Sequence, residues 1–174
     1  MRTRIILTLG VCAALAASAG AGALAAGNPA GTHESKTHLA KPKLENRALF
    51  AVLTGRKEVD ASGHRGAGDP NGRGSFTAIV DDDQLCFGIT VKDLGAAPIA
   101  AHIHGPARPN QNAAVVVPLV APSTPDPGAS SGCVSVDPAL ALAILKHPHR
   151  YYANVHTTQF PGGAIRGQLT RKPR

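Results

Sequence analysis

Two histidines separated by a single residue, His102 and His104, are the first feature of this 174-residue sequence that points to chemistry. On a β-strand, residues two apart share one face and lie roughly 6.5–7 Å apart, so a slight bend lets both imidazoles reach one ion. His156, in the penultimate expected strand, is the natural third ligand. Three imidazoles with an open position suit zinc, and tetragonal nitrogen donors suit copper(II). The three histidines are therefore a candidate site for copper or zinc.

Two further polar side chains are expected to support this site. Asn154 shares a strand face with His156, and Arg166 is expected on the same face of the neighbouring strand. A fixed guanidinium beside a cation is unfavourable unless a carboxylate or an anion lies between them. Arg166 is alternatively expected to hold a backbone carbonyl or the C-terminal segment. For the histidines the alternative is structural: each would hydrogen-bond a loop carbonyl and lock an end of the sheet.

No catalytic residue is assigned from the sequence. Residues 128–132 match the G-x-S-x-G nucleophile elbow by their letters. That motif needs a strand before it and a helix directly after it, whereas a Pro-rich loop and a strand are expected here. The acidic triplet 81–83 lacks the spacing and the glycine of a calcium loop, and it predicts a hairpin turn. Because no carboxylate is placed by a motif as a general base, a non-catalytic protein is favoured over an enzyme.

The N-terminus has the three parts of a secretory signal. Arg2 and Arg4 are positive, residues 5–17 are apolar, and residues 23–25 read Ala-Leu-Ala, a small-residue cleavage site. The apolar run is shorter than the roughly 20 residues that a membrane-spanning helix needs. We expect a signal peptide over residues 1–25, no transmembrane segment after its cleavage, and a secreted protein in the extracellular space or the periplasm.

Two cysteines follow the expected cleavage point, Cys86 and Cys133. An even number of cysteines in an exported chain indicates a disulfide. Alternation of apolar residues places both cysteines on the outer face of their strands, which supports this pairing. Two free thiols are the alternative.

Short strands dominate the pattern after residue 46. Hydrophobic residues make up 43% of the sequence and alternate with polar ones, and Gly (19) and Pro (14) punctuate the segments. One helix is expected, with Asp137 as its N-cap, Pro138 at its first position and an end at Lys146. The pattern predicts an all-β fold, an antiparallel β-sandwich or barrel of about eight short strands with one short helix. The expected strands cover residues 49–53, 76–80, 85–91, 99–104, 114–120, the segment around Cys133, 150–157 and 164–170.

Composition also limits the partners. Aromatic residues are 3% of the sequence and Trp is absent, so we expect no nucleic acid partner, because such proteins stack bases on aromatic rings. Residues 26–45 are polar and predict a flexible linker, and residues 63–74 predict a mobile glycine-rich loop. A basic tail, residues 171–174, would favour an anionic surface. An extracellular protein is the other partner class that we consider.

Three segments together resemble the CHRD domain, which is named for chordin and also occurs in many bacterial exported proteins. They are residues 101–107 (AHIHGPA), 152–157 (YANVHT) and 160–169 (FPGGAIRGQL). Residues 53–59 (LTGRKEV) and 74–76 (GSF) are similar to the family as well. The resemblance covers residues 46–170. Ala164 departs from it, since the family usually carries Glu before the Ile-Arg-Gly.

The resemblance implies an extracellular β-sandwich or barrel module and says little about its biochemistry. Our leading hypothesis is an exported, non-catalytic CHRD module whose histidines at the end of the sheet serve a metal or a partner. The second hypothesis is a copper- or zinc-binding protein that uses His102, His104 and His156. A metal-dependent enzyme is a distant third.

Overall fold

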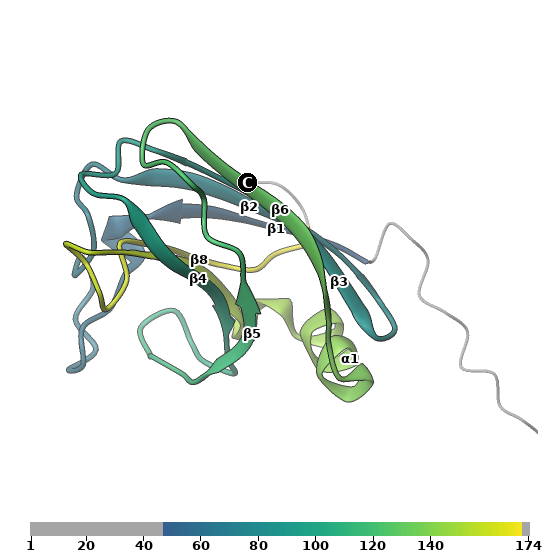
Figure 1. The fold of residues 1–174 in the computed structure, drawn as a ribbon. Coiled ribbons are helices and arrows are strands. Elements are labelled where there is room, and N and C mark those ends of the chain that lie inside the picture. The colour runs from purple at the N-terminus through teal and green to yellow at the C-terminus, as the bar shows by residue number, and fades with distance from the viewer. Residues whose placement is uncertain (1–46, 172–174) are drawn as a thin grey trace, which may run out of the picture. The chain divides into compact units, whose positions relative to one another are not determined.

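The structure is a computed structural model that describes residues 47–171. The expected signal peptide (1–25), the expected linker (26–45) and residues 172–174 of the basic tail lie outside the described residues. Within the described chain, all eight strands belong to one antiparallel sheet with the order β5-β4-β7-β8-β1-β2-β3-β6 (Figure 1). The strands are β1 (Ala48–Thr54), β2 (Arg73–Asp81), β3 (Gln84–Lys92), β4 (Pro98–His104), β5 (Val115–Leu119), β6 (Gly128–Ser135), β7 (Tyr152–Thr157) and β8 (Ile165–Gln168).

The sheet curls until its two edge strands approach each other. In Figure 1, β1, β2, β3 and β6 lie over β4, β5 and β8. The Ser130 hydroxyl, in β6, donates a hydrogen bond to the carbonyl of Val120, directly after β5 (2.8 Å). The result is a nearly closed, barrel-like sheet with one α-helix, which confirms the expected all-β fold.

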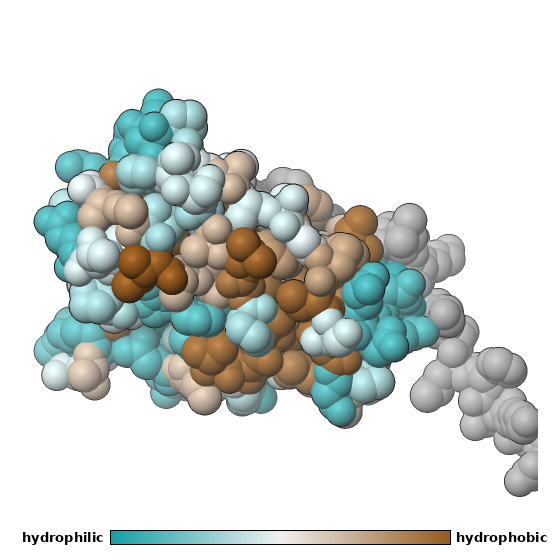
Figure 2. Space-filling model, in the orientation of Figure 1, coloured by the Kyte–Doolittle hydropathy of each residue, from teal (hydrophilic) through white to brown (hydrophobic). Residues whose placement is uncertain are grey.

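The core fills the inside of this curled sheet because apolar residues recur at every second position. In β2, Phe76, Ala78 and Val80 are buried, whereas Ile79 between them is 49% exposed. Each large side chain buried in this way contributes roughly 1.5–3 kcal/mol. Apolar side chains remain visible on the face shown in Figure 2. The exposed large apolar residues of the described chain include Ile99 of β4 and Val115 of β5.

Helix α1 (Pro138–Lys146) begins and ends where its sequence signals place it. The Asp137 carboxylate accepts hydrogen bonds from the backbone N–H groups of Ala139 (2.8 Å) and Leu140 (3.1 Å), as an N-cap does. Ile144 is fully buried and packs its face of the helix against the core. A 3-10 turn, η3 (Pro148–Arg150), then leads into β7.

Cys86 and Cys133 form a disulfide, as the sequence predicts. They face each other directly in the register of β3 and β6, with their Cα atoms 3.9 Å apart. In the chain-entropy picture, a loop with a separation of 47 residues is stabilised by about 4 kcal/mol. The bridge therefore secures β6, an edge strand, to the sheet.

Two other sequence motifs have plain structural positions. Residues 128–132 lie inside strand β6, without the sharp strand-to-helix turn of a nucleophile elbow. Asp82 and Asp83 form the turn between β2 and β3, as expected, and Asp81 and Asp82 pair with Arg47. Among the described residues, no helix is long and apolar enough to cross a membrane.

The expectation of a mobile loop over residues 63–74 is wrong in its second half. Asp69 is only 4% exposed, and its carboxylate accepts hydrogen bonds from the N–H groups of Asn71, Gly72 and Gly95. The last two residues of the segment already belong to β2. The backbone N–H of Asp69 also donates to the carbonyl of Ala164, so this part of the segment is held against the start of β8.

Candidate metal centre

The structure brings His102, His104 and His156 together on the outer face of the sheet. His102 and His104 come from β4 and His156 comes from the adjacent strand β7, in which Asn154 lies directly opposite His102. One ligand atom from each imidazole lies within 4.8 Å of the other two. His104 is 8% exposed, and the other two histidines are half-buried.

The backbone carbonyl of Pro161 fixes the tautomer of His156, and through it that of His102. The Nδ1 atom of His156 lies 2.9 Å from the carbonyl oxygen of Pro161, which only accepts hydrogen bonds, so this nitrogen carries the proton. The Nε2 atom of a neutral His156 is then a lone-pair donor. It lies 3.2 Å from Nδ1 of His102, which donates to it in the absence of a metal. A ring whose second nitrogen is held by a carbonyl is the usual arrangement of a metal-binding histidine.

The spacing of these two nitrogens fits a metal ion. Two nitrogens that bind one tetrahedral zinc ion at 2.0–2.1 Å are about 3.3 Å apart. The distance between His102 Nδ1 and His156 Nε2 is 3.2 Å. A metal ion would therefore take the place of the proton that the two imidazoles share.

His104 is held by two partners. Its Nδ1 lies 2.9 Å from the carbonyl of Ala113 and its Nε2 lies 3.1 Å from the side-chain oxygen of Asn154. The Tyr152 ring is stacked on the imidazole, with a centroid distance of 4.8 Å. His104 is thus the most fixed of the three histidines, and its Nδ1 proton is again donated to a carbonyl.

Burial disfavours the charged forms of His102 and His104. It lowers the pKa of His102 below the ordinary value, and the neighbouring His156 and His104 lower it further. Burial also lowers the pKa of His104, against its hydrogen bonds to Ala113 and Asn154, which act in the opposite direction. Because metals bind the unprotonated ring, the lowered pKa values of His102 and His104 favour a metal over a proton.

Glu58 is a functional candidate that the sequence did not reveal. It follows the 3-10 turn η2 (Gly55–Lys57), is only 2% exposed, and its Oε1 has no hydrogen-bond partner. Burial raises its pKa to about 7, although Arg166 and a hydrogen bond from Asn154 act to lower it. Gly163 makes room for it, because a Cβ at that position would lie 2.5 Å from the carboxyl carbon.

Asn154 links Glu58 to His104, and two bonding patterns satisfy all three groups. In one, the amide of Asn154 donates to a Glu58 carboxylate and its oxygen accepts from a protonated His104. In the other, the amide is turned over, so that a protonated Glu58 donates to it and it donates to a neutral His104. Both patterns contain the same number of protons. The second leaves His104 neutral, and a metal ion at its Nε2 would replace the hydrogen bond from Asn154.

Arg166 lies beside Asn154 in the register of β7 and β8, as expected, but the Tyr152 ring separates it from His104. Its guanidinium carbon lies 3.3 Å from the centroid of that ring and its Nη2 donates to the carbonyl of Gln111 (2.8 Å). The contacts of Arg166 therefore match the alternative expectation, in which this arginine holds a backbone carbonyl. The arginine fixes the loop that follows β4 over the sheet.

The remaining evidence on identity comes from comparison with known proteins. A family model for the CHRD domain matches residues 49–169, which is most of the described chain. A search of curated proteins finds no match. The match to the family model includes all eight strands except the first residue of β1, together with the three histidines. The chain belongs to the CHRD domain family.

Proposed function

We propose that this protein is an exported CHRD module that binds one copper or zinc ion through His102, His104 and His156. The observation that carries the proposal is the approach of three imidazole ligand atoms to within 4.8 Å of one another. The carbonyls of Pro161 and Ala113, which hold two of the rings by Nδ1, support it. The disulfide is in keeping with an oxidising compartment.

The donor set favours binding over catalysis. Three neutral imidazoles suit both zinc and copper, and they leave a coordination position open. Glu58 reaches the centre only through Asn154, and no other acidic side chain of the described chain belongs to the cluster. A general base in contact with a bound water is therefore missing from this part of the chain. We assign the module a role in holding or transferring the ion.

A structural role is the second candidate. The hydrogen bonds of His104 and His156 to loop carbonyls favour it, because such bonds would secure the loops without a metal. The two functions differ in one measurable respect. A structural role requires no metal uptake by the folded protein.

Metal analysis of tag-free protein tests the proposal. We expect one equivalent of copper or zinc per chain, and loss of uptake in the variant His102→Ala/His104→Ala/His156→Ala. His147→Ala/His149→Ala is the matched control, because these histidines form a separate pair with ring centroids 6.4 Å apart. Unchanged uptake in the triple variant would dismiss the site.

The triple variant loses two contacts to the backbone, so its folding must be checked separately. His102→Ala alone is the safer test, because the hydrogen bond that His102 makes through its ring is to His156 and not to a loop. We expect this variant to keep its far-ultraviolet circular dichroism and to bind metal more weakly. A folded variant with wild-type affinity would favour the structural role.

A further inference from the structure

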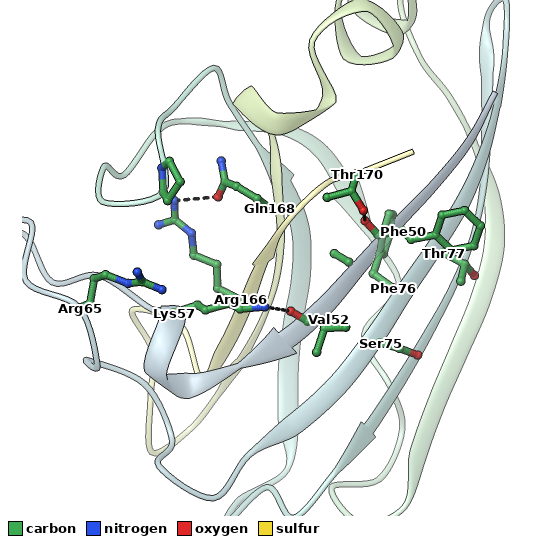
Figure 3. A pocket seen from close by; sticks show the side chains of 12 residues that line it. Phe50, Val52, Lys57, Arg65, Ser75, Phe76, Thr77, Arg166, Gln168 and Thr170 are labelled. Carbon is green, nitrogen blue, oxygen red and sulfur yellow. Dashed lines mark hydrogen bonds between the residues drawn. The ribbon is translucent and has the colours of Figure 1, made fainter. Parts of the chain in front are cut away.

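A cavity of about 390 Å³ lies on the outer face of β1, β2 and β8 (Figure 3). Its size is at the lower end of the range for small-molecule sites. The metal centre lies on the same face, but none of its three histidines lines the cavity. Its lining includes the apolar residues Phe50, Val52 and Pro109 and the arginines Arg65 and Arg166.

One part of the cavity is apolar. Phe50 and Val52 project from the outer face of β1, and Val52 remains 46% exposed. Pro109 from the loop after β4 extends this surface. An apolar wall of this kind favours a hydrocarbon or aromatic ring over water.

The other part of the cavity is cationic. Figure 3 shows Arg65 and Arg166 on one side of it, with Lys57 beside them. Arg166 is only 1% exposed, and neither arginine forms a salt bridge with any residue of the described chain. Burial lowers the pKa of Arg166, the charges of Tyr152 and Glu58 act to raise it, and the neighbouring charge of Arg65 lowers it again.

Within the cavity, Arg65 and Arg166 face no acidic side chain. The lining residues include no Asp or Glu. Among the described residues, the hydrogen-bond partners of the Arg166 guanidinium are neutral oxygens of Arg108, Gln111, Asn112 and Gln168. An anion at this end would relieve the repulsion between the arginines and accept charge-assisted hydrogen bonds, which are stronger than neutral ones.

We propose that this cavity binds a small amphipathic anion, with its acid group beside Arg65 and Arg166 and its apolar body along Phe50, Val52 and Pro109. The positive charge at one end and the apolar surface at the other select this class of ligand. A neutral hydrocarbon would give the arginines no anion, and an inorganic anion would leave the apolar wall exposed to water. The site is separate from the metal centre. Either proposal stands if the other fails.

Calorimetric titration with octanoate tests the proposal on the full mature chain. We expect one bound octanoate per chain, and no binding of octylamine, which has the same tail and the opposite charge. Arg65→Gln should weaken octanoate binding about tenfold, the loss of one charge-assisted contact. Arg56→Gln is the matched control, because this exposed arginine is absent from the lining.

A second variant tests the apolar wall. Val52→Trp fills the cavity from an outward-facing position and should abolish binding of octanoate, while the triple histidine variant should bind it normally. Any one of three results would overturn the proposal. These are a failure of octanoate to bind, binding of octylamine as tight as that of octanoate, and equal effects of Arg65→Gln and Arg56→Gln. Loss of metal uptake with normal octanoate binding would concern the metal centre alone.

Discussion

The ring of Tyr152 lies flat against the imidazole of His104, with ring centroids 4.8 Å apart and an angle of 3° between the planes. The guanidinium of Arg166 lies 3.3 Å from the centroid of the same tyrosine ring. Two planar groups this close to one ring must cover opposite faces of it. Tyr152 therefore orients His104 from one side and holds a fixed positive charge one ring away from the metal centre on the other.

Removal of the Tyr152 ring tests this arrangement. Tyr152→Leu leaves His104 without its stacking partner, and we expect zinc affinity to fall about tenfold, as for other residues that orient a metal ligand. Tyr152→Phe keeps the ring and loses only the hydroxyl, which accepts the N–H of Ala113 at 3.3 Å. Competition with a chromophoric chelator measures both affinities. Equal losses in the two variants would show that stacking does not orient the ligand.

The buried carboxyl of Glu58 predicts a stability that changes with pH. Because its pKa is raised from 4.5 to about 7, the folded chain holds this proton more tightly than the unfolded chain does. The contribution of Glu58 is fully present below about pH 4.5 and is lost as the pH rises through about 7, a change of roughly 3 kcal/mol.

The comparison with Glu58→Gln isolates this contribution, since the amide has a similar shape and does not titrate. Urea unfolding of both proteins between pH 4.5 and 8 should give free energies of unfolding whose difference changes in favour of the variant as the pH rises. Parallel curves across this range would mean that Glu58 is ionised in the folded protein throughout.

The disulfide is expected to stabilise the sheet without affecting the metal centre. Cys86→Ala/Cys133→Ala should lower the free energy of unfolding by about 2–5 kcal/mol in a urea titration. In the sheet, β8, β1 and β2 separate β7 from β3, so metal uptake by the folded variant should stay at the wild-type level. A loss of metal from the folded variant would show that the two features are coupled.

The N-cap of α1 offers a local test of the fold. Asp137→Ala leaves the N–H groups of Ala139 and Leu140 without their acceptor and should destabilise the protein by about 1 kcal/mol. Asp83→Ala is the control, since this exposed carboxylate makes no side-chain hydrogen bond within the described residues. Thermal unfolding of the two variants gives the comparison. Equal melting temperatures would contradict the assignment of Asp137 as the cap.

The sequence predicted the features that depend on local pattern. Alternation along β4 and β7 places His102, His104 and His156 on one face, and Asp137 followed by Pro138 marks the start of the helix. The disulfide followed from the even number of cysteines after the expected cleavage point and from their outward positions. In each case the signal comes from neighbouring positions in one strand or one helix turn.

The residues that the sequence did not assign depend on contacts between distant segments. Glu58 is buried because the chain after β1 folds against Gly163 and Asn154, about a hundred positions later, and no periodicity in residues 55–72 predicts this. Asp69 is buried for the same kind of reason. Tyr152 could have been placed beside His104, since it alternates with Asn154 and His156 on the outer face of β7.

X-ray absorption at the metal edge tests the central claim most directly, because it counts the imidazoles around the ion. For the wild-type protein loaded with one equivalent of zinc, the account predicts three imidazole nitrogens at about 2.0–2.1 Å and one fewer in His102→Ala. A spectrum that shows no imidazole ligands, or one that His102→Ala and the triple variant leave unchanged, would contradict it.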